Sequence, residues 1–181
     1  MKIAGVAIAM FVATNLDDIL ILAMFFAQPN RRAQAIVAGQ FLGIGALVAA
    51  SSAIALAVLA VPRGWTALLG VVPVAIGIRR LLQSRRAEGG PPAVAPGVLS
   101  VAGVTIASGG DNLGVYVPVF AQEPWAIPRV ATIFAIMTAV WCAAGWALVA
   151  HPIVQSRMQR YGHRVLPWVL IAIGVRVLWA W

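Results

Sequence analysis

The stretch IAGVAIAMFVATNLDDILILAMFFA, which runs from Ile3 to Ala27, decides the fold of this chain. It is apolar throughout except for a short polar group that ends in Asp17 and Asp18. A helix of about 20 apolar residues crosses the hydrocarbon core of a bilayer, and this stretch is longer than that. It is also longer than the apolar core of a signal peptide. We therefore expect a retained first membrane span with two aspartates near its centre.

The rest of the chain has the same character. Of its 181 residues, 62% are hydrophobic and only 10% are charged, whereas soluble domains are closer to half apolar. In hydrocarbon every backbone N–H and C=O group needs an internal partner, which leaves helices or closed barrels. The apolar runs lack the alternation of barrel strands. The sequence therefore predicts an all-α integral membrane protein that lies in the lipid bilayer.

Six apolar runs have about the length of a membrane span, and we expect six transmembrane helices. The runs are Ile3–Ala27, Ala33–Val61, Trp65–Leu82, Val98–Ala121, Ile127–Ala150 and Val165–Trp181. The segment 83–97 differs from them, because it is rich in Arg, Gly and Pro and cannot pack as a span. We interpret it as a linker between two units, residues 1–82 and 98–181.

The two units resemble each other in sequence. Adding 94 to the residue number aligns ATNLDD at 13–18 with ASGGDN at 107–112, so that Asp17 and Asp111 are counterparts. A shared acid in two apolar runs does not follow from apolarity alone. Because each unit has three spans, the two units must lie inverted in the bilayer, and transporters of this kind bind substrates near the midplane. We predict two inverted three-helix repeats.

The basic residues indicate the orientation. The formal net charge of +8 comes from thirteen Lys and Arg residues, most of them between the apolar runs or at their ends. Basic residues in short loops favour the cytoplasmic side, so we interpret them as topology signals and not as a nucleic-acid surface. The first, third and fifth loops with the adjoining helix ends hold nine of the thirteen. We expect both termini outside the cytoplasm and the 83–97 linker inside it.

Three of the five carboxylates in the chain, Asp17, Asp18 and Asp111, lie near the centres of spans. An aspartate at this depth costs about 2.5–3.5 kcal/mol even on the lowest scales, so it needs a partner or a function. Arg79 and Arg176 are candidate partners, but both lie near span ends and reach the interface more easily. We therefore expect a functional site.

Amide side chains accompany the acids. Asn15 precedes Asp18 by three residues, which places the two side chains close together on a helix. Asn112 directly follows Asp111. Carboxylate and amide oxygens suit a divalent cation. We predict a metal site with Asp17 and Asp111 as central ligands and both asparagines completing the shell; the cation is the substrate, and no cofactor is expected.

Asp18 belongs to the same predicted metal site and has a separate role in it. Three negative charges exceed what one divalent ion cancels, and a spare acid can carry a proton when the metal leaves. Asp18 is the candidate, because its counterpart in the repeat is the neutral Asn112. Such an exchange would couple metal export to proton entry.

The fourth apolar run contains residues that weaken a helix around Asp111. The pair Gly109–Gly110 precedes the acid, and Pro118 follows about two turns later. Non-helical backbone is tolerated at membrane depth where it lines a cavity or is buried in protein, and its carbonyl groups can face a cation. Close helix packing is an equally good interpretation of the glycines.

Two further polar residues receive a structural interpretation. Gln40 lies in GQFLG at 39–43, whose GxxxG spacing is typical of close helix packing rather than of a ligand. Cys142 is the only cysteine, so the chain has no intramolecular disulfide and no thiolate metal motif. A lone buried cysteine usually packs as a small apolar residue.

Together these motifs resemble the CadD-type cadmium resistance transporters, which belong to the LysE-type exporter superfamily. The resemblance covers nearly the whole chain. It is carried by NLDD at 15–18, GQFLG at 39–43, SGGDN at 108–112 and YVP at 116–118, together with Pro73 and Gly77. It implies efflux of cadmium or a related divalent cation across the bacterial plasma membrane. An oxygen-rich site also suits manganese, zinc or calcium, and formation of a homo-oligomer is left open.

Two other classes of function are alternatives. An amino-acid exporter of the same superfamily needs a positive site for a carboxylate at the midplane, and the spans offer no Lys or Arg there. An intramembrane aspartyl protease needs a Gly-x-Gly-Asp motif, which SGGD at 108–111 only approaches, and an aromatic residue before its second aspartate. Asp17 instead follows Leu16. We therefore expect a transporter and not an enzyme.

Overall fold

The computed structural model describes residues 2–28, 32–58, 71–82, 97–150, 171 and 175. Every regular element in this part of the chain is a helix, which confirms the all-helical prediction there. The elements are α1 (Lys2–Ala27), α2 (Ala33–Val58), α4 (Val71–Leu82), α5 (Val98–Ser108), α6 (Gly110–Gln122), the short 3-10 helix η2 (Pro124–Ala126) and α7 (Ile127–Ala150).

Three stretches of the described helices are long and apolar enough to cross a bilayer, namely Ile3–Ala27, Ala33–Val58 and Pro124–Val149. The pair α5 and α6 makes a fourth span if the two are taken together. α4 covers the last 12 residues of the predicted third span, Trp65–Leu82. The predicted sixth span, except for residues 171 and 175, and the linker at 83–96 lie outside the described residues. The six-span arrangement therefore stays a prediction.

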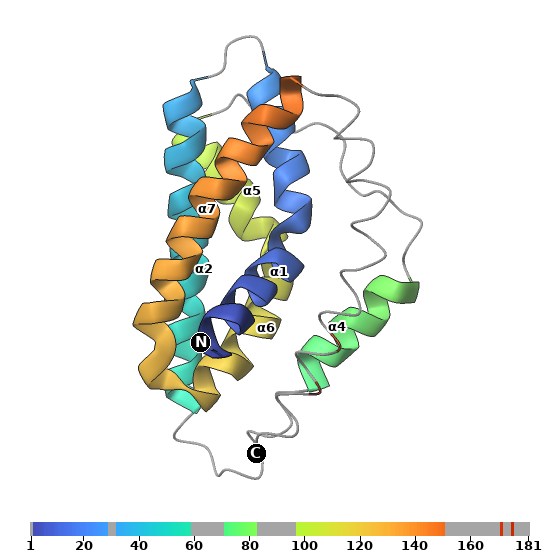
Figure 1. The fold of residues 1–181 in the computed structure, drawn as a ribbon, viewed down its shortest axis with the longest axis vertical. Coiled ribbons are helices and arrows are strands. Elements are labelled where there is room, and N and C mark those ends of the chain that lie inside the picture. The colour runs from blue at the N-terminus through green and yellow to red at the C-terminus, as the bar shows by residue number, and fades with distance from the viewer. Residues whose placement is uncertain are drawn as a thin grey trace.

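The helices run in two opposite directions (Figure 1). α1 and α7 run one way, and α2 and the α5–α6 pair run the other way. α1 packs along α7, and α2 packs along α5 and α6. Each of these two interfaces joins a helix from the first half of the chain to a helix from the second half.

Two glycines allow α2 and α5 to approach closely. A Cβ atom on Gly39 would lie 2.6 Å from the carbonyl oxygen of Val98, and a Cβ atom on Gly43 would lie 2.7 Å from the Cβ atom of Thr105. A larger residue at either position would overlap with α5. The GxxxG prediction of close helix packing is therefore confirmed at this interface.

Aromatic side chains fill the space between α1, α6 and α7. The ring of Phe11 lies 5.2 Å from Phe134 and 5.3 Å from Trp141, both in edge-to-face geometry. The ring of Tyr116 lies 4.8 Å from Phe134. Such pairs stabilise a core beyond the effect of their burial. This core carries the polar groups of Tyr116 and Trp141 to the interior of the bundle.

Candidate functional site

The predicted fourth span is broken at Gly109. α5 ends at Ser108, α6 begins at Gly110, and the two helices are bent by 68°. Gly109 has φ −79° and ψ 17°, outside α-helical values. The expected weakening of the helix before Asp111 is thus confirmed. Asp111 lies in the first turn of α6, where the helix dipole favours negative charge.

The first span contains a break of its own. Asn15 has φ −117° and ψ 17° inside the otherwise helical α1. Trp141 on α7 donates its indole N–H to the Asn15 carbonyl oxygen over 2.6 Å. At the second break Leu47 of α2 packs against Gly109, where a Cβ atom would lie 2.7 Å from Leu47 Cδ2. A side chain from the opposite half of the chain therefore contacts each break.

The two asparagines of the predicted site are buried and bonded to each other. Asn112 Nδ2 donates to Asn15 Oδ1 over 3.1 Å. Asn15 Nδ2 donates to the Tyr116 hydroxyl over 2.9 Å, and that hydroxyl lies 3.0 Å from Thr14 Oγ1. Asn112 Oδ1 is buried and has no hydrogen-bond donor within the described part of the chain. Because buried polar atoms normally have a partner, this oxygen is a candidate ligand atom.

Asp18 is the most deeply buried of the three acids, with 4% of its surface exposed. Gln40 Nε2 donates to Asp18 Oδ2 over 3.2 Å, and Ser108 Oγ donates to Asp18 Oδ1 over 3.1 Å. Thr105 Oγ1 in turn donates to Gln40 Oε1 over 2.7 Å. Side chains from α2 and α5 therefore hold both oxygens of a carboxylate that belongs to α1.

The other two acids lie near Asp18 without closing around one point. Asp17 and Asp111 are half-buried, and both lie within electrostatic range of the Asp18 carboxylate. Among the described residues, no group of three or more Asp, Glu, His or Cys side chains is close enough to hold a metal ion. The structure thus brings the two asparagines into contact and places the three acids near one another. Among the described residues, it does not assemble the three acids into a coordination shell.

The depth of the acids agrees with a site inside the bilayer. Asp17 lies ten residues before the end of α1 at Ala27, which is about 15 Å along the helix axis and about half of the hydrocarbon thickness. Arg79, a candidate partner for these acids, is exposed on α4. This exposure does not support pairing with a buried acid. Arg176 lies outside the described residues.

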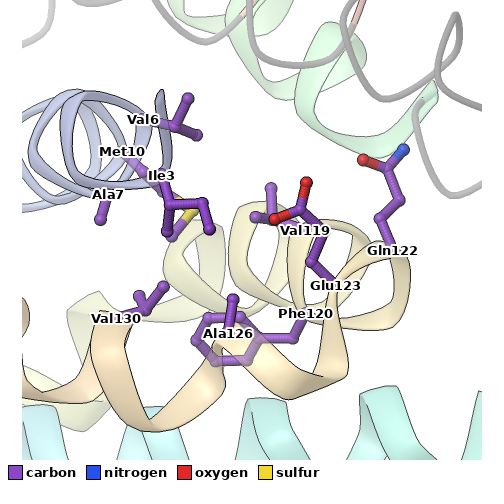
Figure 2. A pocket seen from close by; sticks show the side chains of 10 residues that line it. All are labelled: Ile3, Val6, Ala7, Met10, Val119, Phe120, Gln122, Glu123, Ala126 and Val130. Carbon is purple, nitrogen blue, oxygen red and sulfur yellow. The ribbon is translucent and has the colours of Figure 1, made fainter. Parts of the chain in front are cut away.

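A mainly apolar cavity lies between the first residues of α1 and the last residues of α6 (Figure 2). It is next to the buried network of polar side chains around Asn15 and Asp18. The Met10 carbonyl oxygen on its α1 side accepts a hydrogen bond from Thr14, and the Phe120 ring on its α6 side lies 6.0 Å from that of Tyr116. Thr14 and Tyr116 therefore connect the walls of the cavity to the buried asparagines. The lining residues are Ile3, Val6, Ala7, Met10, Val119, Phe120, Gln122, Glu123, Ala126 and Val130.

The sequence prediction omitted several residues of this network. It assigned no role to Thr105 or Trp141, it used Tyr116 only as part of a motif, and it interpreted Gln40 as part of a packing motif. A usable signal was present, because an O–H, N–H or amide group in the middle of an apolar run needs a buried partner. The sequence did not indicate which partner each group would find.

Comparison with protein-family models matches residues 11–180 to the family described as cadmium resistance transporter. The matched region contains both acidic motifs and all of the helices described above except the first residues of α1. The family resemblance inferred from the motifs is thereby confirmed. No curated protein and no solved structure matches the chain.

Proposed function

Because this chain belongs to the cadmium resistance transporter family, we propose that it exports cadmium or a related divalent cation across the bacterial plasma membrane. One observation carries the proposal beyond the family. Buried carboxylate and amide oxygens gather where two apolar helices are both interrupted. Ionisable side chains and non-helical backbone are costly in a membrane interior and mark pathways for ions or substrates.

The proposed ligands are Asp17 and Asp111 at the centre, with Asn15 and Asn112 as neutral oxygen ligands. Two carboxylates balance the charge of one divalent ion. Asn112 Oδ1 supports this assignment, because it is a buried acceptor without a donor in the described residues. The acids do not converge on one point in this structure.

The predicted inverted repeat is supported by the positions of the two breaks. The offset of 94 residues that aligns Asp17 with Asp111 also aligns Asn15 with Gly109, and both of these residues have ψ 17°. α1 and the α5–α6 pair run in opposite directions (Figure 1). An in-plane two-fold axis brings equivalent positions to the same depth, so both breaks would lie at the site.

The side chains that contact the breaks obey the same offset. Leu47 contacts the break at Gly109, and its counterpart, 94 residues later, is Trp141, which contacts the break at Asn15. A chance alignment of two apolar sequences gives no reason for this agreement. We therefore retain two inverted units, 1–82 and 98–181. The arginine distribution supports an 83–97 linker in the cytoplasm and both termini outside.

Proton coupling is assigned to Asp18. Within the described part of the chain, its hydrogen-bond donors, Gln40 and Ser108, are neutral groups. The charge of the carboxylate is therefore left for the metal ion or for a proton to balance. Release of the metal on the outside and uptake of a proton by Asp18 in its place would lower the uncompensated negative charge of the site as it returns to the cytoplasmic side.

Transport into inverted membrane vesicles tests the proposed function. Vesicles that contain the protein should accumulate cadmium, zinc or manganese when a pH gradient is applied, and vesicles with Asp17→Asn plus Asp111→Asn should not. Accumulation that is independent of the gradient would contradict the proposed proton coupling and would still agree with metal export. Unchanged levels of all three metals, together with transport of a cationic amino acid, would favour the other activity of the superfamily.

A further inference from the structure

The interface between α2 and α5 contributes to the site through a pair of side chains outside the ligand set. We propose that Gln40 is a positioning residue for the Asp18 carboxylate, and that Thr105 anchors the Gln40 amide beside this carboxylate. The inference rests on the proposed function, because it concerns the same cation site.

The hydrogen-bonding groups allow one arrangement of the amide. An ionised carboxylate can only accept hydrogen bonds, so the Gln40 amide must present its Nε2 group to Asp18. Its Oε1 atom then faces Thr105, whose hydroxyl donates to it over 2.7 Å. Gln40 and Thr105 are 2% and 3% exposed, which leaves little access for water to replace either bond. The carboxylate therefore sets which end of the amide faces it, and the threonine hydroxyl holds the amide in that place.

The close packing of α2 on α5 brings Thr105 within reach of Gln40. The Thr105 methyl group occupies the space beside Gly43, where a Cβ atom on the glycine would lie 2.8 Å from Thr105 Cγ2. With the methyl group in this notch, the hydroxyl on the same carbon points elsewhere and reaches Gln40. The GxxxG motif thus serves the site as well as the packing, because it brings a short side chain within reach of the glutamine.

Loss of the Thr105 hydroxyl releases the amide. Gln40 Oε1 would then lose the donor seen here, and the amide would be held only through its bond to Asp18. The carboxylate would leave its present position and balance the charge of a nearby cation less well. A hydrogen bond of this kind corresponds to a change in the dissociation constant of about three- to tenfold. We expect a loss of cation affinity in this range.

Substitutions at Thr105 separate the hydroxyl from the packing. Thr105→Val keeps the volume and loses the hydroxyl, whereas Thr105→Ser keeps the hydroxyl and loses the methyl group. Thr105→Ala and Thr105→Ser form a second pair that differs only in the hydroxyl, which keeps the test decisive if the valine variant does not fold. Thr138→Val is the matched control, because Thr138 is also buried and its hydroxyl is bonded to its own helix at the Phe134 carbonyl oxygen.

The experiment is equilibrium binding of Cd²⁺ to the purified full-length chain in detergent, with the melting temperature of the metal-free protein measured in parallel. Thr105→Val and Thr105→Ala should bind about three- to tenfold more weakly than the wild type, while Thr105→Ser and Thr138→Val bind with wild-type affinity. Lower melting temperatures with unchanged affinity in both hydroxyl-lacking variants would show a purely structural role and overturn the inference.

A double-mutant cycle tests whether Thr105 acts through Asp18. Asp18→Asn should weaken binding by at least the same factor, and Thr105→Val should have no further effect in that background, because the carboxylate that it positions is gone. Additive effects of the two substitutions would overturn the inference and leave the proposed function intact. A wild-type protein that binds none of Cd²⁺, Zn²⁺ and Mn²⁺ would overturn both.

Discussion

The indole N–H of Trp141 is bonded to the main-chain oxygen of Asn15, and this bond joins the middle of α7 to the break in α1. The two residues are 126 positions apart in the chain. A main-chain carbonyl at a helix break needs a donor in a membrane interior, where water does not supply one. The second half of the chain therefore stabilises the irregular backbone from which the first acidic motif projects.

We expect Trp141→Phe to destabilise the protein, because an aromatic ring remains against Phe11 while the Asn15 carbonyl loses its donor. An unsatisfied buried acceptor costs about 1–3 kcal/mol. The measurement is equilibrium unfolding in mixed micelles. Trp146→Phe is the control, since Trp146 lies on the same helix and is 60% exposed. Equal stability of the two variants would show that the bond to Asn15 contributes nothing measurable.

The break at Gly109 gives a second prediction. Gly109→Ala should destabilise the protein by about 1–3 kcal/mol, because the added methyl group would overlap with the Leu47 side chain. Gly110→Ala is a matched control one residue away, where a Cβ atom would meet nothing within 4 Å. Thermal unfolding of both variants in detergent shows whether Gly109→Ala is less stable than Gly110→Ala.

A compensating change tests the cause of that effect. Leu47→Ala alone leaves a cavity, but combined with Gly109→Ala it removes the overlap. We expect the double variant to be more stable than the sum of the two single effects predicts. If the two effects simply add, the contact between α2 and the helix break is not what requires a glycine.

The orientation prediction rests on the arginine distribution and on the inverted units. In a Cys142→Ala background, a cysteine introduced at Ala180 should react with an impermeant thiol reagent in intact cells, and a cysteine at Ala93 should react only after the membrane is opened. The reverse pattern would place both termini in the cytoplasm. The repeat itself would survive that outcome, because inversion of the whole protein keeps the two units inverted relative to each other.

The span boundaries could be predicted where the apolar runs have clear ends. The predicted run Ile127–Ala150 and the helix α7 have the same bounds. The break at Gly109 could also be anticipated, because two glycines in succession weaken a helix locally. The break at Asn15 could not be anticipated, because an asparagine is tolerated in a helix. Its non-helical conformation accompanies a hydrogen bond from Trp141 on another helix.

The surroundings of the acids were less predictable than their presence. A carboxylate in an apolar run indicates a site from local sequence alone. Its partners depend on the register between helices, which the pattern of apolar residues does not specify. The GxxxG spacing predicted that α2 packs closely on another helix, and this is correct at Gly39 and Gly43. It did not indicate that the same contact would bring Thr105 to Gln40 and Gln40 to Asp18.

The central prediction concerns the division of roles among the acids. Asp17→Asn and Asp111→Asn should each abolish metal transport while the protein still inserts into the membrane, because either change leaves a divalent ion with too little negative charge in a low-dielectric interior. Asp18→Asn should keep measurable binding, with weaker affinity and a changed pH dependence, since Asp18 carries the proton in the proposed exchange. Equilibrium binding of Cd²⁺ to the purified variants across pH measures both effects.

Glu123→Gln is the control for these variants, because Glu123 is a carboxylate at the apolar cavity and outside the buried network. It should bind and transport the metal as the wild type does. Full affinity in Asp111→Asn together with complete loss in Asp18→Asn would reverse the assignment. The metal would then be held by the acid that Gln40 and Ser108 orient, and Asp111, at the start of α6, would be the group that exchanges the proton.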